Sequence, residues 1–377
     1  MNNANTSNPH ILVIGDTHLR DSHMQSLPRG DDFTAAFRWC VQYAIDNKMA
    51  AVAHGGDLLN CNKPSSQNME DLFSIHRLAR ENSMPVYVVT GNHDMAEPSW
   101  SAVVQDTFGD SEYGIICADN KRFLIPGTTV TLQGLPFLGR EDLQKRLDEA
   151  NPSDILLWHG LVKEFVGFPV EGAVEISDFL TDKFRAVLLG DIHVNDYRVQ
   201  PSGLLIGYPG STELCTKSEA LEKYACVLEV PPTGPIKVPT NVVIPTRPAR
   251  CFRVNVEEDL SRILAELQAE KFDRPPLIFI AYNPTVPGVI TRIKNAVTAE
   301  AIVRYEALQE TKFDLAAVVA TEKVEAGVEL KELIGTFLPP GKPRHLAEQL
   351  VDPDVNAKEL VSAFSQTRLQ ELAEAAE

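Results

Sequence analysis

Short apolar runs, each ending in polar residues, recur through the first two thirds of the chain. The first five lie at 10–15, 50–53, 85–89, 154–158 and 184–189. Their β-branched and aromatic residues follow one another without polar alternation, which is typical of parallel strands buried on both faces. Further runs at 204–211 and 224–230 predict the last strands of the same domain.

Amphipathic stretches separate the first three runs. The segment 31–45 places Phe37, Val41 and Ala44 at helical spacing and begins with acidic residues, which favours a helix. A second helix is predicted over about 67–81. Strands that alternate with helices predict an α/β domain with a parallel sheet, and such sheets bind ligands at the carboxyl ends of their strands.

The rest of the chain shows three other patterns. The stretch between about 95 and 153 is expected to be rich in loops, and residues 231–248 hold six prolines, which predicts an extended linker with one edge strand at most. After the linker comes a small α+β domain. Its strands are expected at 251–256, 277–282 and 301–305, and its helix at 257–270.

The last part of the chain predicts a helix that needs a partner. Residues 355–376 carry an apolar stripe on an otherwise polar helix, after a helix at 330–337 and a Pro-Pro-Gly break. Such a stripe packs on its own domain or docks another protein's helices, and we favour docking. The docking candidates are Leu360, Phe364, Leu369 and Leu372. The expected parts are an α/β domain (1–232), a linker (233–248), a small domain (249–322) and a tail (323–377).

Length and composition fit an ordinary globular protein. A chain of 377 residues is too long for one small core and fits one large domain with smaller ones. No apolar run approaches the roughly 18 residues of a membrane span, and the polar segment 1–10 lacks the features of a secretion signal. Six scattered cysteines without a CxxC pair predict reduced thiols, so we expect a cytoplasmic protein without membrane contact.

The net charge of −17 restricts the possible partners. Electrostatic binding of nucleic acid needs a basic face, which a chain of this charge does not favour. A metal site lined by carboxylates accounts for only a small part of the excess. The charge therefore counts against any function in which this chain alone holds DNA.

Histidine, aspartate and asparagine gather at five strand ends. A single loop histidine is most often only hydrogen-bonded, but four of the nine histidines lie within three residues of an apolar run. Carboxylate, imidazole and amide groups without thiolate favour Mn²⁺, iron or Zn²⁺ over Ca²⁺ or a structural zinc. There are too many ligands for one ion, which indicates two ions about 3.5–4 Å apart. The candidates are Asp16, His18, Asp57, Asn92, His93, His159, Asp191 and His193.

These strand ends resemble the motifs of the calcineurin-type metallophosphoesterases. The chain carries D-x-H, G-G-D, G-N-H-D, an isolated H-G and G-D-x-H in that order. Within the superfamily it looks closest to the SbcD branch, the nuclease subunits that include the meiotic-recombination-eleven repair proteins. The narrower likeness rests on the segments 16–19, 29–33, 208–211 and 244–248 and on Glu219. The resemblance covers about residues 1–320.

The resemblance implies a four-layer α/β metallophosphoesterase sandwich with a small α+β capping domain and a helical tail. It implies that one metal is held by Asp16, His18, Asp57 and His193. Asp57 would bridge to a second metal, which is held also by Asn92, His159 and Asp191. His93 would be the general acid that protonates the leaving oxygen, and Asp94 would steer it.

Two positions depart from the family pattern. Asp191 stands where the family usually has histidine; aspartate can still bind a metal but adds negative charge. Asn60 stands where the family often has a histidine that contacts DNA, three residues after the bridging aspartate. Asn60 can still donate to a phosphate. Arg29 is the other candidate for a DNA contact, although a solvated loop residue is the commoner role for such an arginine.

The resemblance implies a Mn²⁺-dependent DNA nuclease of repair, recombination or replication, with exonuclease and endonuclease activity. It also implies a homodimer that works with an SbcC-like coiled-coil ATPase. The chain has no GxxxxGK[ST] motif, so ATP dependence would come from that partner, which would also supply much of the DNA-binding surface.

Two other functions remain open. A phosphatase or cyclic-nucleotide phosphodiesterase could use the same site, and the acidic charge favours it. A non-catalytic scaffold could use metal only for folding. His93 beside a full ligand set argues against the scaffold, because a structural site needs no proton donor.

Overall fold

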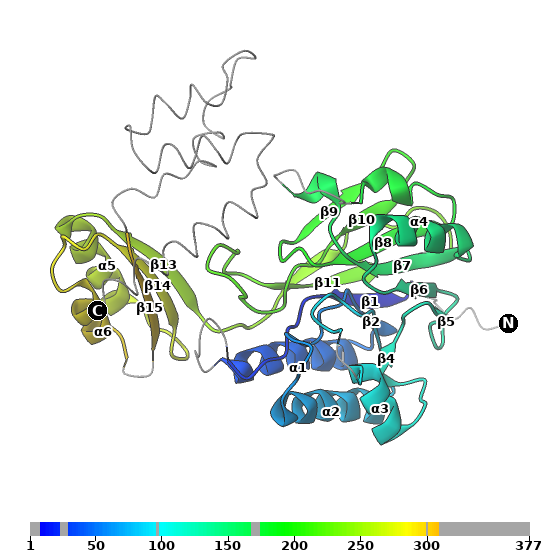
Figure 1. Ribbon diagram of the computed structural model, residues 1–377, viewed down its shortest axis with the longest axis horizontal. Coiled ribbons are helices and arrows are strands. Elements are labelled where there is room, and N and C mark those ends of the chain that lie inside the picture. Colours follow the sequence, from blue (N-terminus) through cyan, green and yellow to red (C-terminus); the bar gives the residue numbers. More distant parts are fainter. Residues whose placement is uncertain (1–7, 23–28, 96–97, 167–173, 299–300, 309–377) are drawn as a thin grey trace, which may run out of the picture. The chain divides into compact units, whose positions relative to one another are not determined.

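Two six-stranded sheets and one three-stranded sheet make up the computed structural model (Figure 1). It describes residues 8–22, 29–95, 98–166, 174–298 and 301–308, which all belong to one unit, Met1–Leu308. Among the helices of these ranges, none combines the length and the apolar character that crossing a membrane requires.

The first sheet contains the three strands that open the chain's alternating pattern. Its order is β12-β11-β1-β2-β3-β4. The parallel strands are β1 (His10–Ile14), β2 (Ala51–His54), β3 (Pro85–Val88) and β4 (Gly114–Cys117). β11 (Tyr224–Glu229) runs antiparallel to β1, and β12 (Thr240–Val243) runs antiparallel to β11. β12 is an edge strand within the proline-rich linker, for which the sequence predicted one edge strand at most.

The second sheet has the same mixed character. Its order is β5-β6-β7-β8-β10-β9. The parallel strands are β6 (Thr131–Leu135), β7 (Ser153–His159), β8 (Phe184–Gly190) and β10 (Leu205–Tyr208). The antiparallel edges are β5 (Arg122–Leu124) and β9 (Asp196–Val199). The two sheets therefore each present a row of parallel strand ends.

The inner strands are buried on both faces, as their unbroken apolar sequences predict. In β1, Ile11 and Val13 join the core between the sheets, and Leu12 and Ile14 pack beneath helices. Helices α1 (Gly30–Asp46) and α2 (Ser66–Glu81) cover the first sheet, and α4 (Arg140–Glu149) covers the second. The expected α/β architecture is confirmed as two mixed sheets flanked by helices.

The stretch expected to be rich in loops contains regular structure. Besides β4, β5, β6 and α4 it holds the helix α3 (Trp100–Phe108). Two short 3-10 helices follow at Lys163–Phe165 and Ile176–Phe179. Strand β5 has no buried residue, so no apolar run marks it in the sequence. Helix α4 has only two buried residues, Leu143 and Leu147, which is a weak signal.

The small domain differs from the expected α+β arrangement. Strands β13 (Ala249–Val254), β14 (Leu277–Tyr282) and β15 (Ile302–Ala307) are parallel neighbours. Because parallel neighbours need crossover connections, helices α5 (Glu257–Ala269) and α6 (Val289–Ala296) alternate with them. The domain is thus a β-α-β-α-β unit, and α6 was not predicted.

Some sequence predictions concern parts of the chain outside the described residues. The tail and the two helices predicted in it fall there, and so do the docking candidates Leu360, Phe364, Leu369 and Leu372. The boundaries expected near 232 and 249 lie inside the unit Met1–Leu308 and stay predictions.

A buried group of charges ties α1 to the end of the linker. The Asp32 carboxylate accepts hydrogen bonds from Arg29 Nε (3.1 Å) and from two nitrogens of Arg247 (2.7 and 2.9 Å). Arg29 also donates to Glu213 Oε1 at 2.8 Å. Arg29, Asp32 and Glu213 are all buried, so these ion pairs are shielded from water and from salt.

We predict that Asp32→Ala lowers the free energy of unfolding by about 3–5 kcal/mol, because two arginines lose a buried carboxylate. Urea unfolding followed by circular dichroism measures it. In the control, Glu70→Ala removes an exposed pair with Arg77 on α2 and should cost at most about 1 kcal/mol. Equal losses in the two variants would contradict a structural role for the buried group.

Candidate metal centre

The carboxyl ends of the two parallel rows meet at one place. Gly190, at the end of β8, lies so close to Gly55 that a Cβ atom on Gly190 would be 2.1 Å from the Gly55 oxygen. The Asp191 backbone N–H donates to Asp16 Oδ1 at 3.0 Å, which joins the end of β8 to the end of β1. The five strand ends singled out in the sequence are therefore brought together.

The first half of the site contains two facing imidazoles. His18 Nε2 lies 3.1 Å from His193 Nε2. His193 Nε2 is 3.9 Å from Asp16 Oδ1, and His18 Nε2 is 3.6 Å from Asp57 Oδ2. Asp16 is fully buried, and its Oδ2 has no hydrogen-bond partner. A buried carboxylate oxygen without a partner is costly unless a cation binds it.

The second half lies on the other side of Asp57. His159 Nε2 is 3.5 Å from Asp57 Oδ1 and 4.0 Å from Asp191 Oδ1. The two oxygens of Asp57 thus face different histidines, one in each half of the site. This is the placement that a carboxylate shared by two ions requires.

The Asn92 amide tests whether a cation fits this second half. Its oxygen lies 3.0 Å from His159 Nε2 and 3.2 and 3.3 Å from the two Asp57 oxygens. His159 Nδ1 donates to the Gly55 carbonyl at 2.9 Å, so Nε2 carries a lone pair. All the facing atoms are then acceptors, unless the amide turns and donates through its nitrogen. A cation among them satisfies every one, and the oxygen and nitrogen donors fit a divalent metal.

Burial shifts the pKa values of the three carboxyl groups and of His159 in the direction that favours their neutral forms. Burial, together with the Asp57 carboxylate, raises the pKa of Asp16 to about 8. Burial likewise raises the pKa of Asp57 to about 7 and raises that of Asp191. It lowers the pKa of His159 to about 3, which keeps that ring neutral and able to ligate. His193 lowers the pKa of all three carboxyl groups without outweighing burial, so bound cations would stabilise their charged forms further.

The backbone at the site is strained. Positive φ angles occur at Asp16 (51°), His18 (45°), Asp57 (53°) and Asp191 (104°). These are four of the seven non-glycine residues with positive φ in the described ranges. Such conformations are unfavourable for residues with a Cβ atom and concentrate at functional sites. The residues with a strained backbone are therefore among the candidate metal ligands whose side chains lie close together.

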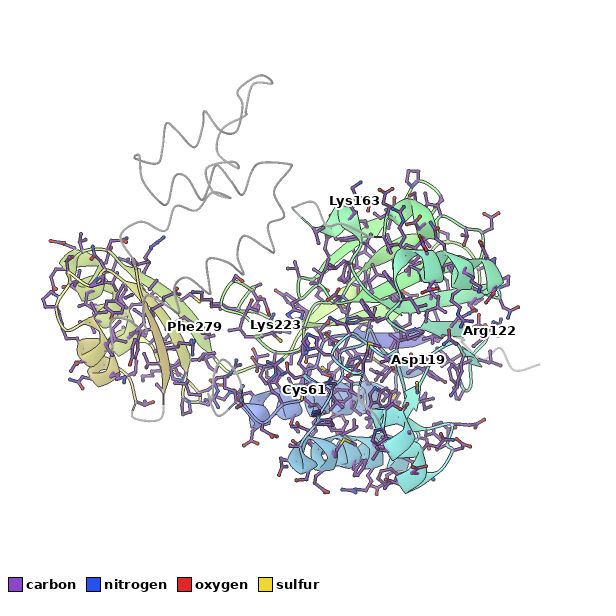
Figure 2. The ribbon with its side chains drawn as sticks, viewed as in Figure 1. Cys61, Asp119, Arg122, Lys163, Lys223 and Phe279 are labelled. Carbon is purple, nitrogen blue, oxygen red and sulfur yellow. The ribbon has the colours of Figure 1, made fainter. Side chains whose placement is uncertain are left out.

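Sequence reasoning did not assign the groups that orient the ligand rings. His193 Nδ1 pairs with Glu219 Oε1 at 2.9 Å, and Lys223, labelled in Figure 2, holds the other oxygen of Glu219 at 2.5 Å. The i, i+4 spacing of Glu219 and Lys223 was the available signal. A backbone acceptor such as the Gly55 oxygen cannot be predicted from side-chain identity, because every residue has a backbone oxygen.

The proton donor proposed by resemblance, His93, sits at the exposed side of the site. Its side chain is 46% exposed, and its Nε2 lies 4.0 Å from Asp57 Oδ2. His93 Nδ1 lies 2.9 Å from the Asn60 carbonyl oxygen, which can only accept a hydrogen bond. The ring is therefore oriented by Asn60, with Nε2 left toward the centre.

Asp94 does not contact His93, contrary to the expectation that it steers the ring. Its carboxylate is fully buried and accepts hydrogen bonds from the backbone N–H groups of Leu58, Leu59 and Gly91 (2.7–3.0 Å). A Cβ on Gly91 would lie 2.2 Å from an Asp57 oxygen. Asp94 thus fixes the loops around the bridging aspartate and acts on His93 only through them.

The two candidate DNA contacts differ in accessibility. Arg29 is 1% exposed, and its guanidinium pairs with Asp32 and Glu213. A buried guanidinium cannot reach a DNA phosphate, so the interpretation of Arg29 as a contact is wrong. Asn60 is partly exposed beside His93 and stays a candidate.

Comparisons with known proteins identify the family of the chain. A family model described as calcineurin-like phosphoesterase matches residues 9–198, half of the chain. The DNA double-strand break repair protein Mre11 of Halobacterium salinarum is 30% identical over 213 residues, which cover 55% of this chain and 53% of that protein. The Mre11 protein of Sulfolobus acidocaldarius is 24% identical over 296 residues, covering 74% and 75%.

Several of these matches cover only part of the related protein. The chain spans about half the length of the first curated relatives it matches, 53% and 46% for the Halobacterium salinarum and Haloferax volcanii proteins. Among solved structures, a dimetal phosphatase from Danio rerio is 10% identical with a TM-score of 0.43, covering 63% of this chain and 99% of that one.

Because Asp57 lies between the two halves, we predict that Asp57→Asn loses both metal ions. Removing the shared carboxylate should lower the affinity of each position by at least about 10–100-fold. Metal analysis after gel filtration measures the bound ions per chain. Asn60→Ala is the control and should keep its metals, because Asn60 offers only a backbone oxygen to the site. Two ions retained by Asp57→Asn would refute the bridge.

Proposed function

The chain belongs to the calcineurin-like phosphoesterase family and is distantly related to Mre11-type repair proteins, and we propose that it is a two-metal DNA nuclease. The observation that carries the proposal is the position of Asp57 between two sets of ligand atoms, with His93 beside it at the exposed side. A proton donor next to paired metal positions fits the cleavage of a phosphate ester.

We assign the ligands as follows. One ion is held by Asp16, His18, Asp57 and His193, and the other by Asp57, Asn92, His159 and Asp191. The carboxylate, amide and imidazole groups fit Mn²⁺, which is the metal we propose. Bound divalent ions polarise the phosphate and generate a nucleophile at neutral pH.

His93 supplies the proton in this proposal. The Asn60 carbonyl accepts from Nδ1–H, which fixes the orientation of the ring. Nε2–H then faces the centre and donates to the leaving oxygen of the substrate. Half of the ring is exposed, so it can contact a substrate that binds from solvent.

We propose that the chain acts with a partner. A charge of −17 disfavours DNA binding by this chain alone, so an SbcC-like coiled-coil ATPase would supply the basic surface. The tail docking residues that would hold this partner lie outside the described residues and stay predictions. The same applies to the homodimer.

The acidic charge also favours a second function, a phosphatase or cyclic-nucleotide phosphodiesterase. Purified protein with Mn²⁺ should be assayed on linear duplex DNA, single-stranded DNA, a phosphomonoester and a cyclic nucleotide. A nuclease cleaves DNA, and faster with the ATPase. Cleavage of only the small substrates would replace the nuclease with this alternative. No hydrolysis by metal-loaded protein, with or without the ATPase, would favour a scaffold.

For the proton donor, we predict that His93→Ala lowers the cleavage rate of DNA by about 10²–10⁴, the usual contribution of general acid catalysis. Metal content should stay near normal, since His93 is not among the assigned ligands. The loss should be much smaller for a nitrophenyl phosphodiester, whose leaving group needs no proton. An equal loss on both substrates would mean that His93 acts as a ligand or structural residue.

A further inference from the structure

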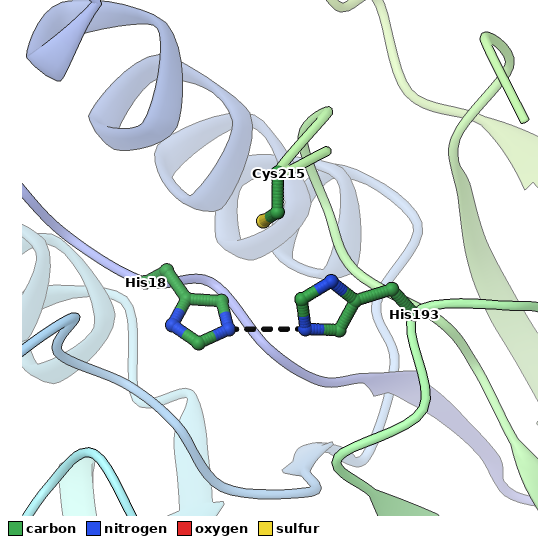
Figure 3. A group of neighbouring side chains, drawn as sticks. All are labelled: His18, His193 and Cys215. Carbon is green, nitrogen blue, oxygen red and sulfur yellow. Dashed lines mark hydrogen bonds between the residues drawn. The ribbon is translucent and has the colours of Figure 1, made fainter. Parts of the chain in front are cut away.

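A cysteine thiol lies beside two of the assigned ligands. The Cys215 sulfur and one ring nitrogen each of His18 and His193 all lie within 4.8 Å of one another. Figure 3 shows the sulfur directed toward the space between the two rings. Metal bonds of about 2.3 Å to sulfur and 2.1 Å to nitrogen place two ligands of a tetrahedral ion roughly 3.6 Å apart. Small side-chain movements therefore bring all three atoms to one ion.

Hydrogen bonds hold the cysteine in this position. Its backbone N–H donates to Glu219 Oε2 at 3.2 Å, while Glu219 Oε1 pairs with His193 Nδ1 at 2.9 Å. One carboxylate thus fixes both the ring and the cysteine backbone. The Arg20 guanidinium donates to the His18 oxygen at 2.9 Å and lies 3.9 Å from the sulfur. Arg20 and Glu219 thus each contact Cys215 together with one of the two histidines.

The surroundings of Cys215 differ from those of the other buried cysteines. Cys40 and Cys226 belong to apolar cores, and the Cys226 sulfur also contacts the Asn195 and Asn241 amides rather than any histidine of the described residues. Cys215 is 8% exposed but belongs to none of the apolar clusters formed by the described residues.

Independently, the buried Asp16 has an oxygen, Oδ2, without a partner, which points to a cation beside this carboxylate. Asp16 Oδ1 lies 3.9 Å from His193 Nε2, and Asp16 also groups with Asp57 and His159, so it lies between the two halves of the site.

We propose that Cys215 is a sulfur ligand of the divalent ion assigned to Asp16, His18 and His193. The inference rests on the proposed metal centre and makes its two positions chemically different. The first would bind through sulfur, nitrogen and oxygen, and the second through nitrogen and oxygen alone. Sulfur ligands favour zinc, whereas manganese prefers carboxylate and water. The first position therefore discriminates between metals more strongly than the second.

Cobalt substitution tests the sulfur directly. The full chain, freed of metal and kept under nitrogen, is titrated with Co²⁺ while its absorption spectrum is recorded. We expect a thiolate-to-cobalt charge-transfer band in the near ultraviolet. Cys215→Ser should lose the band and keep Co²⁺ at the other position. Cys61→Ser is the matched control and should keep the band, since that exposed thiol belongs to neither group of candidate metal ligands in the described residues.

The outcomes separate this inference from the proposed function. Two cobalt ions bound without a band overturn the sulfur ligand and leave the metal centre in place. No cobalt bound by the wild-type chain overturns both. The wild-type spectrum decides without relying on the folding of any variant, and the variants assign the band. In competition titrations, Cys215→Ser should weaken Zn²⁺ by about 10–100-fold and Mn²⁺ much less; equal weakening would contradict the proposal.

Discussion

The structure depends on the electrostatic balance where the two sheets meet. Burial there raises the pKa of Asp16, Asp57 and Asp191, so each carboxylate needs compensating positive charge. The positive charge of His193 lowers all three pKa values but does not outweigh burial, so the protein offsets only part of the effect. The carboxylates at the strand ends are thus held close enough to repel one another, and bound divalent ions would offset this repulsion.

The central strands, and the gathering of polar residues at their ends, could be predicted from the sequence because each has a local signature. Strands buried on both faces appear in the sequence as unbroken apolar runs. The carboxyl ends of parallel strands lie at one edge of the sheet, whatever the conformation of the loops. The short elements between 95 and 153 have no such period, because β5 is stabilised by pairing with β6 and not by burial. The parallel order of the small domain likewise depends on partners that the sequence does not reveal.

Roles that depend on three-dimensional neighbours were harder to predict. Arg29 has the chemistry of a phosphate contact, yet Asp32 and Glu213 bury it. Asp94 follows His93 directly but turns away to accept three backbone N–H groups, and a carbonyl oxygen of Asn60 orients the ring instead. Side-chain identity limits the possible chemistry, and only the packing around it selects one role.

The left-handed backbone at the ligand positions bears on how this fold can evolve. Each such conformation costs roughly 1–2 kcal/mol for a residue with a Cβ atom and almost nothing for glycine. A lineage released from metal binding would gain stability by drifting to glycine at Asp16, His18, Asp57 or Asp191. The sheets and their cores would persist while the ligands disappeared. Inactive descendants of such an enzyme would then have a higher free energy of unfolding than their ancestor. They would be recognisable by glycines at the ends of the strands.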